Sequence, residues 1–208
     1  MAKSIKAIIW DMGGVLLRTE NKQPRKELAE ESEITYEVLD QVVFNSESAQ
    51  QAELGLVEDL DHWKVVAKTL GLDEEKLPGF IEKFWSGDQL DMQLHAWIHS
   101  LRDLYRIGLL SNAWKGTRLT LLSRYPNFFD PFHTSIFSAE VGLRKPDAQI
   151  FALILKEMNV KAEQAVFVDD FDTNIVGAKT AGLQAVQFKT TQQVIKDLCK
   201  LLDGGRID

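Results

Sequence analysis

Short apolar runs that end in polar residues recur along this chain, and they constrain its fold more than any other feature. The first run is IKAIIWD at residues 5–11, which ends in a carboxylate. Four further runs occupy residues 107–112, 135–138, 165–170 and 185–188. Continuous apolar runs of this length are typical of strands that are buried on both faces of a parallel sheet.

Patterns typical of amphipathic helices separate these runs. In the segment 91–105, Leu94, Ile98 and Leu101 recur at three- and four-residue steps. Similar patterns occupy residues 147–158, 172–181 and 191–202. We expect Asp172 to be the N-cap of the third of these four helices. Strands that alternate with helices predict an α/β fold with a Rossmann-like, doubly wound parallel sheet.

The segment 18–88 breaks this alternation. It contains several helical patterns and no clear strand, and Gly71 and Gly79 punctuate it. We therefore expect a helical cap domain at 18–88. The core domain would consist of residues 1–17 plus 89–208.

Composition and charge exclude several classes of protein. The chain has 208 residues, 45% of them hydrophobic and 26% charged, which is typical of a globular protein. Its net charge of −7 disfavours nucleic acid and anionic membranes as general partners. It has no run long enough to span a bilayer, and its first apolar run is too short for a signal peptide. We therefore expect a cytoplasmic monomer or homodimer that acts on a small molecule.

Polar residues follow the predicted strands at the edge where a parallel sheet would gather them. They are Asp11, Ser111, Asn112, Lys145, Asp169 and Asp170. Ligands of doubly wound sheets bind at the carboxyl ends of the strands, near the point where the strand order reverses. Carboxylates are hard oxygen ligands for Mg²⁺, while a hydroxyl and an ammonium group suit phosphate. The sequence therefore predicts a combined Mg²⁺ and phosphate site.

Four motifs, in this order, resemble those of the haloacid dehalogenase superfamily of Asp-nucleophile phosphohydrolases. They are IIWDMGGVL at 8–16, LLSN at 109–112, GLRKPD at 142–147 and VFVDDFDTNIVGAKTAG at 166–182. The resemblance covers nearly the whole chain. It is closest to the sugar-1-phosphate phosphatase-like members, which carry a helical cap and a first motif that reads Asp-x-Gly. It implies a Mg²⁺-dependent phosphatase for a small phosphorylated metabolite, with a sugar phosphate as one candidate.

The resemblance implies a role for each site residue. Asp11 would attack phosphorus and form an aspartyl-phosphate. The metal would be held by Asp11, the backbone carbonyl of Gly13, Asp169 and Asp170.

The same resemblance assigns the phosphate-binding groups. Ser111 and the backbone N–H of Asn112 would bind the phosphoryl oxygens. Lys145 would hold both Asp11 and the phosphate by its charge. Asn174 would orient the loop that carries the two neighbouring carboxylates.

Gly13 departs from the family's pattern, because most of these phosphatases carry a second Asp there as general acid and base. Such help is typically worth about 10²–10⁴-fold in rate. Three hypotheses stay open: a substrate with a good leaving group, a substitute carboxylate such as Glu20 or Glu53, or a catalytically weak phosphate-binding or regulatory protein. A metal-independent 2-haloacid dehalogenase also lacks the second Asp, but the pair Asp169 and Asp170 favours Mg²⁺ and phosphate.

Overall fold

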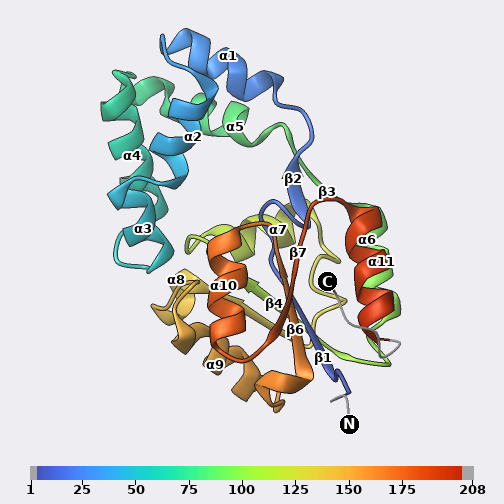
Figure 1. The fold of residues 1–208 in the computed structure, drawn as a ribbon. Helices are drawn as coiled ribbons and strands as arrows, with labels where there is room; N and C mark the ends of the chain where they lie inside the picture. The colour runs from blue at the N-terminus through green and yellow to red at the C-terminus, as the bar shows by residue number, and fades with distance from the viewer. Residues whose placement is uncertain (1–3, 203–208) are drawn as a thin grey trace.

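Within residues 4–202, which the computed structural model describes, the centre of the molecule is a five-stranded parallel sheet (Figure 1). Its strands lie in the order β5-β4-β1-β6-β7. Their bounds are β1 (Ala7–Trp10), β4 (Arg106–Ser111), β5 (Thr134–Phe137), β6 (Ala165–Asp169) and β7 (Gln184–Gln187). Each predicted apolar run overlaps one of these strands, which confirms the predicted α/β sheet. The central strand β1 pairs in parallel with both β4 and β6.

Alternate residues of each strand face opposite layers of helices. In β1, Ile8 and Trp10 pack into one apolar cluster, while Ala7 and Ile9 pack into another on the opposite face. The helices of the first face are α6 (Met92–Ser100) and α11 (Thr191–Leu202), and those of the second are α9 (Ala148–Glu157) and α10 (Asp172–Thr180) (Figure 1). Burial on both faces explains why the strand sequences are apolar without alternation.

The start of α10 differs from our expectation. Asp172 is the first residue of this helix rather than its N-cap, which is Phe171. The Asp169 carboxylate accounts for this start of the helix. The Phe171 N–H donates to Asp169 Oδ1 at 2.8 Å, which fixes the turn between β6 and α10. Asp172 instead places its charge in the first turn, where the helix dipole favours it.

Helices α1 to α5 follow one another between β2 and β3, and we call them the helical segment. Their bounds are α1 (Gln23–Glu31), α2 (Tyr36–Phe44), α3 (Glu47–Glu53), α4 (Asp59–Leu70) and α5 (Leu77–Trp85), with a 3₁₀ turn η1 (Glu74–Lys76) before α5. They pack around an apolar cluster in which Leu39, Trp63 and Phe84 are buried, and Trp114 from the loop after β4 joins it. Figure 1 shows the helical segment on the side of the sheet where α7 (Thr117–Arg124) and α8 (Ser138–Val141) lie.

A two-stranded antiparallel ribbon joins the helical segment to the rest of the molecule. It consists of β2 (Leu17–Thr19) and β3 (Asp88–Leu90). The sequence pattern predicts no strand in 18–88, and that prediction is wrong because strands of three residues are too short to show a pattern. Arg18 anchors the ribbon, since its Nη2 lies 2.8 Å from Asp91 Oδ2 at the start of α6.

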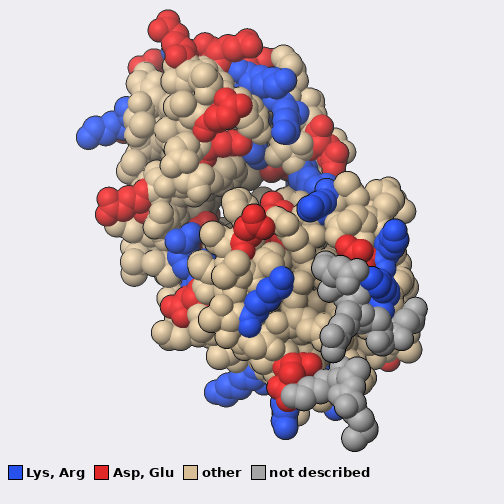
Figure 2. All heavy atoms as spheres, in the orientation of Figure 1, with Lys and Arg blue, Asp and Glu red and all other residues tan. Residues whose placement is uncertain are grey.

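The surface shows no strong segregation of charge on the face in Figure 2, where acidic and basic residues are interspersed. Among residues 4–202, no helix combines the length and apolarity that crossing a membrane requires. The cytoplasmic location, the oligomeric state and the lack of a nucleic-acid partner stay predictions from the sequence.

Candidate active site

Three carboxylates meet at the carboxyl ends of β1 and β6. Asp11 follows β1, Asp169 ends β6, and Asp170 comes next. One oxygen from each carboxylate lies within 4.8 Å of the other two. The two strands are parallel neighbours, with Trp10 paired to Val168, so the residues that follow these two positions emerge at the same edge of the sheet. The structure thus brings together the three carboxylates that the sequence analysis selected.

Lys145 lies between two of these carboxylates. Its Nζ atom is 2.7 Å from Asp11 Oδ1 and 2.7 Å from Asp169 Oδ2, and the side chain is only 1% exposed. Burial by itself lowers the pKa of Lys145, but the two carboxylates outweigh this effect and raise the pKa above its ordinary value. The lysine therefore stays charged. It ties the end of β1 to the end of β6.

Asn112 holds the backbone of Lys145 in place. Its Oδ1 accepts from the Lys145 N–H at 2.8 Å, and its Nδ2 donates to the Lys145 carbonyl at 3.0 Å. The sequence motif predicts a role only for the backbone N–H of Asn112 and gives no sign of this side-chain contact. Ser111, the last residue of β4, is buried beside it. The Ser111 Oγ makes a long 3.5 Å contact with the Asn112 carbonyl.

The two neighbouring carboxylates of the β6 end differ in their surroundings. Asp169 accepts hydrogen bonds from the Phe171 N–H at 2.8 Å and from Asn174 Nδ2 at 3.1 Å to each oxygen, besides its contact with Lys145. Asp170 Oδ1 is buried and has no hydrogen-bond partner within residues 4–202. Burial, followed by repulsion from Asp169, raises the pKa of Asp170 to about 6. A buried carboxylate oxygen without a donor fits a cation ligand.

Asp11 is oriented by two donors on the same oxygen. The Met12 N–H donates to its Oδ1 at 2.7 Å, and Lys145 Nζ contacts the same atom. Burial raises the pKa of Asp11 well above its ordinary value, an effect that Lys145 opposes and Asp169 reinforces. The cluster thus holds more carboxylates than the one lysine balances, which favours a bound cation.

Gly13 and Gly14, which follow Asp11 and Met12, differ in how much space surrounds them. Gly14 has a φ of +73°, and a Cβ built on it would lie 2.2 Å from Asp170 Oδ2. A side chain there would displace the Asp170 carboxylate. A Cβ on Gly13 would meet nothing within 4 Å. The site therefore has room at position 13 for the side chain that the sequence lacks.

The helical segment reaches this site through the end of α3. Glu53 Oε2 lies 2.7 Å from Arg144 Nη2, and Arg144 directly precedes Lys145. Glu20, the other carboxylate that the sequence analysis considered, is exposed and paired with Arg18 at 2.9 Å. The structure thus directs Glu53, and not Glu20, toward the loop that carries Lys145.

Residues 5–182 match the haloacid dehalogenase-like hydrolase family. The chain belongs to this family of hydrolases. It is similar to a sesquiterpene phosphatase of Aspergillus oryzae, with 23% identity over 206 residues that cover 97% of this chain and 99% of that protein. It is also similar to a glyceraldehyde 3-phosphate phosphatase of Methanothermobacter thermautotrophicus, with 38% identity over 85 residues that cover 39% of this chain and 36% of that protein.

A solved structure shares the fold of this haloacid dehalogenase-like hydrolase. It is a family enzyme of Bacteroides thetaiotaomicron in complex with magnesium and inorganic phosphate. The TM-score is 0.71 at 18% identity, and the match covers 89% of this chain and 95% of that chain. The family and the fold that the sequence motifs predicted are confirmed, and the protein is an enzyme of the hydrolase class.

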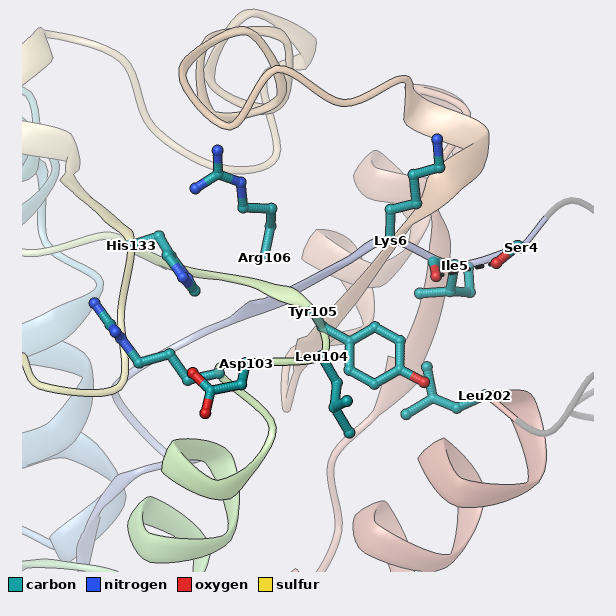
Figure 3. Close-up of a pocket in the computed structure, with 10 residues that line it drawn as sticks. Ser4, Ile5, Lys6, Asp103, Leu104, Tyr105, Arg106, His133 and Leu202 are labelled. Carbon is teal, nitrogen blue, oxygen red and sulfur yellow. Dashed lines mark hydrogen bonds between the residues drawn. The ribbon is translucent and has the colours of Figure 1, made fainter.

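A surface cavity of this hydrolase lies elsewhere. Its volume is about 680 Å³, and it lies at the amino-terminal ends of β1 and β4, where Lys6 and Arg106 line it (Figure 3). His133 also lines it, and its Nδ1 accepts from the Ile107 N–H at 3.0 Å. Since Asp11 and Ser111 lie at the other ends of these strands, this cavity is separate from the carboxylate cluster.

Proposed function

We propose that this hydrolase is a Mg²⁺-dependent phosphatase of a small phosphorylated metabolite, acting through an aspartyl-phosphate on Asp11. The observation that carries the proposal is the cluster of Asp11, Asp169 and Asp170 around the buried ammonium group of Lys145. Carboxylate oxygens in this number suit a hard divalent cation. Both named relatives described above are phosphatases, which supports the same activity here.

The residues present fit a magnesium ion. Asp170 supplies a buried oxygen without a hydrogen-bond partner in the described part of the chain, and Asp11 lies within reach of the same point. The backbone carbonyl of Gly13 and the Asp169 carboxylate would complete the protein ligands. A bound Mg²⁺ would screen the charge of the phosphoryl group against that of the attacking carboxylate.

The remaining steps fall to the side chains of this hydrolase. Asp11 would attack phosphorus with its second oxygen, because the Met12 N–H and Lys145 both hold the first. Lys145 would stabilise the negative charge that builds on the phosphoryl oxygens. Ser111 and the backbone N–H of Asn112 would donate hydrogen bonds to these oxygens. Water would then hydrolyse the aspartyl-phosphate and regenerate Asp11.

We also propose that residues 18–88 act as a cap over this site, with residues 1–17 and 89–208 as the core. The helical segment packs mainly around its own apolar cluster, which Trp114 of the core joins, and two further observations show it close to the core. Asp59 Oδ2 accepts from the Gly116 N–H at 3.0 Å, and a Cβ on Gly55 would lie 2.4 Å from the Ala139 carbonyl. A cap in close contact with the core excludes water from the chemistry.

The alternative in another class is a weak phosphate-binding or regulatory protein, and Gly13 is the observation that favours it. A metal-independent 2-haloacid dehalogenase is the second alternative. It would attack carbon and would have no use for the neighbouring carboxylates Asp169 and Asp170. The two named relatives have different substrates in their names, so they support phosphatase chemistry without selecting one metabolite.

The test is phosphate release from a panel of phosphorylated metabolites, with Mg²⁺ and with EDTA, for the wild type and Asp11→Asn. The panel would hold sugar 1-phosphates, sugar 6-phosphates, nucleotides, acyl phosphates and prenyl phosphates. We expect Mg²⁺-dependent turnover that Asp11→Asn abolishes while the melting temperature stays near that of the wild type. Magnesium binding by the folded wild type without turnover of any substrate would overturn the proposal in favour of the binding protein. Release of halide from 2-haloacids in EDTA would favour the dehalogenase.

A further inference from the structure

The site has room for an acid at position 13 and no side chain to fill it. Gly13 keeps a backbone conformation outside the left-handed region, and nothing lies within 4 Å of the position of its Cβ. The backbone would therefore accept an aspartate there. Another group has to deliver a proton to the leaving oxygen, unless the substrate needs none.

The helical segment offers few carboxylates for this task. Glu58 is exposed and paired with Lys115, and Asp59 accepts a hydrogen bond from the Gly116 N–H. Glu20 is exposed and paired with Arg18. Glu53 differs from all of these in the partner that it contacts. Its side chain is only 15% exposed and points to Arg144, the neighbour of Lys145.

The contacts of Glu53 connect it to the carboxylate cluster through Arg144 and Lys145. Lys145 Nζ touches the nucleophile Asp11, and the charge of Lys145 also acts on the Glu53 carboxylate. Arg144 Nε is buried without a hydrogen-bond partner in the described part of the chain, while its Nη2 holds the Glu53 carboxylate at 2.7 Å. The α3 helix that carries Glu53 lies against α8 of the core, where Gly55 allows close approach to Ala139 (Figure 1).

We propose that Glu53, held by Arg144 at the boundary of the helical segment and the core, replaces the missing residue 13 side chain as general acid and base. This inference rests on the proposed phosphatase function and names the group that completes it. Burial raises the pKa of Glu53 above its ordinary value, although Arg144 and Lys145 oppose the shift. The raised pKa supports a carboxyl group that carries a proton more readily than an exposed glutamate does.

Glu53 gives up its proton in the first step and regains one in the second. In the first, Asp11 forms a bond to phosphorus, the bond from phosphorus to the ester oxygen breaks, and that oxygen takes the proton of the Glu53 carboxyl group. In the second, the Glu53 carboxylate takes a proton from water while the water oxygen attacks phosphorus. The bond to Asp11 breaks, inorganic phosphate leaves, and both side chains return to their first state.

The test measures kcat/KM of the Glu53→Gln variant for two substrates that differ in their leaving group. An alkyl phosphate needs a proton on its leaving oxygen, whereas 4-nitrophenyl phosphate leaves as a stable phenolate. We expect kcat/KM to fall by about 10²-fold or more for the alkyl phosphate and by less than about tenfold for 4-nitrophenyl phosphate. Glu58→Gln is the matched control, because it also removes an ion pair between the helical segment and the core. It should change both substrates by the same factor.

A second variant tests the role by rescue. Adding Gly13→Asp to Glu53→Gln should restore the alkyl phosphatase activity, since the backbone has room for that side chain. An equal loss for both substrates, or no loss, would overturn the role of Glu53 and leave the phosphatase proposal intact. Wild-type protein that turns over neither substrate nor any member of the metabolite panel would overturn both proposals together.

Discussion

Two adjacent glycines offer a matched test of the geometry of the carboxylate cluster. A Cβ on Gly14 would lie 2.2 Å from Asp170 Oδ2, whereas a Cβ on Gly13 would meet nothing within 4 Å. Only Gly14 has a positive φ, at +73°. The same chemical change, Gly→Ala, should therefore have opposite consequences at two neighbouring positions.

The size of the difference follows from these two observations. A non-glycine residue in the left-handed region costs about 1–2 kcal/mol. An alanine in an ordinary conformation stabilises by about 0.4–1 kcal/mol, because it restricts the unfolded chain. Gly14→Ala should thus be about 2 kcal/mol less stable than Gly13→Ala. For a domain of this size that corresponds to about 4–8 °C in melting temperature.

The effect on metal binding should be larger than the effect on stability. Ordinary contact begins near 3.4 Å, so the Asp170 carboxylate has to move away from a Cβ on Gly14. We expect Mg²⁺ affinity to fall about ten- to hundredfold in Gly14→Ala, the range seen when support of a metal ligand is lost. Gly13→Ala keeps its backbone carbonyl and should bind Mg²⁺ as the wild type does.

Thermal unfolding without metal and calorimetric titration with Mg²⁺ measure the two quantities separately. Equal melting temperatures for the two variants would refute the argument from backbone conformation. Wild-type Mg²⁺ affinity in Gly14→Ala would refute the argument that Asp170 is a ligand held in place by the close approach of Gly14.

Three further predictions concern neighbouring contacts. Because the pKa of Asp170 is raised to about 6, protons should compete with the metal, and calorimetry should show Mg²⁺ affinity falling as the pH drops through about 6. An affinity independent of pH between about 5 and 7 would contradict this. Asn112→Ala removes both hydrogen bonds to the Lys145 backbone and should lower the free energy of unfolding in urea by about 1–3 kcal/mol. Gly177→Ala should cost about 1–3 kcal/mol in the same assay, since its Cβ would lie 2.7 Å from Pro146; an unchanged midpoint would refute the close packing.

The strands and the three carboxylates could be predicted from the sequence for one physical reason. A strand buried on both faces is apolar throughout, so the first carboxylate after it marks where the strand leaves the sheet. Asp11 and Asp169 stand out in this way after AIIW and AVFV. Parallel pairing of β1 with β6 then places them at the same edge.

Other features of the site produce no recognisable pattern in the sequence. The contact between the Asn112 side chain and the Lys145 backbone joins residues 33 positions apart. The pair of Glu53 with Arg144 joins two segments that meet only in the folded molecule. The demand for glycine at position 14 comes from the nearby Asp170 carboxylate, which is far away in the chain. Of these three features, only the need for glycine at position 14 has a weak sequence signal, the two consecutive glycines in the first motif.

The electrostatics of the cluster connect the metal to the choice of reaction. Lys145 contacts Asp11 and Asp169 and leaves Asp170 without a cation of its own among the described residues. Uncompensated buried charge is costly, and a phosphate anion that approached this cluster would add to the repulsion. A divalent cation removes both problems at once, because it balances the third carboxylate and attracts the phosphate. A dehalogenase that attacks carbon faces no second anionic charge at the reacting atom and gains nothing from the third carboxylate. The charge balance of Asp11, Asp169 and Asp170 against one lysine is therefore an argument for phosphate as the group attacked.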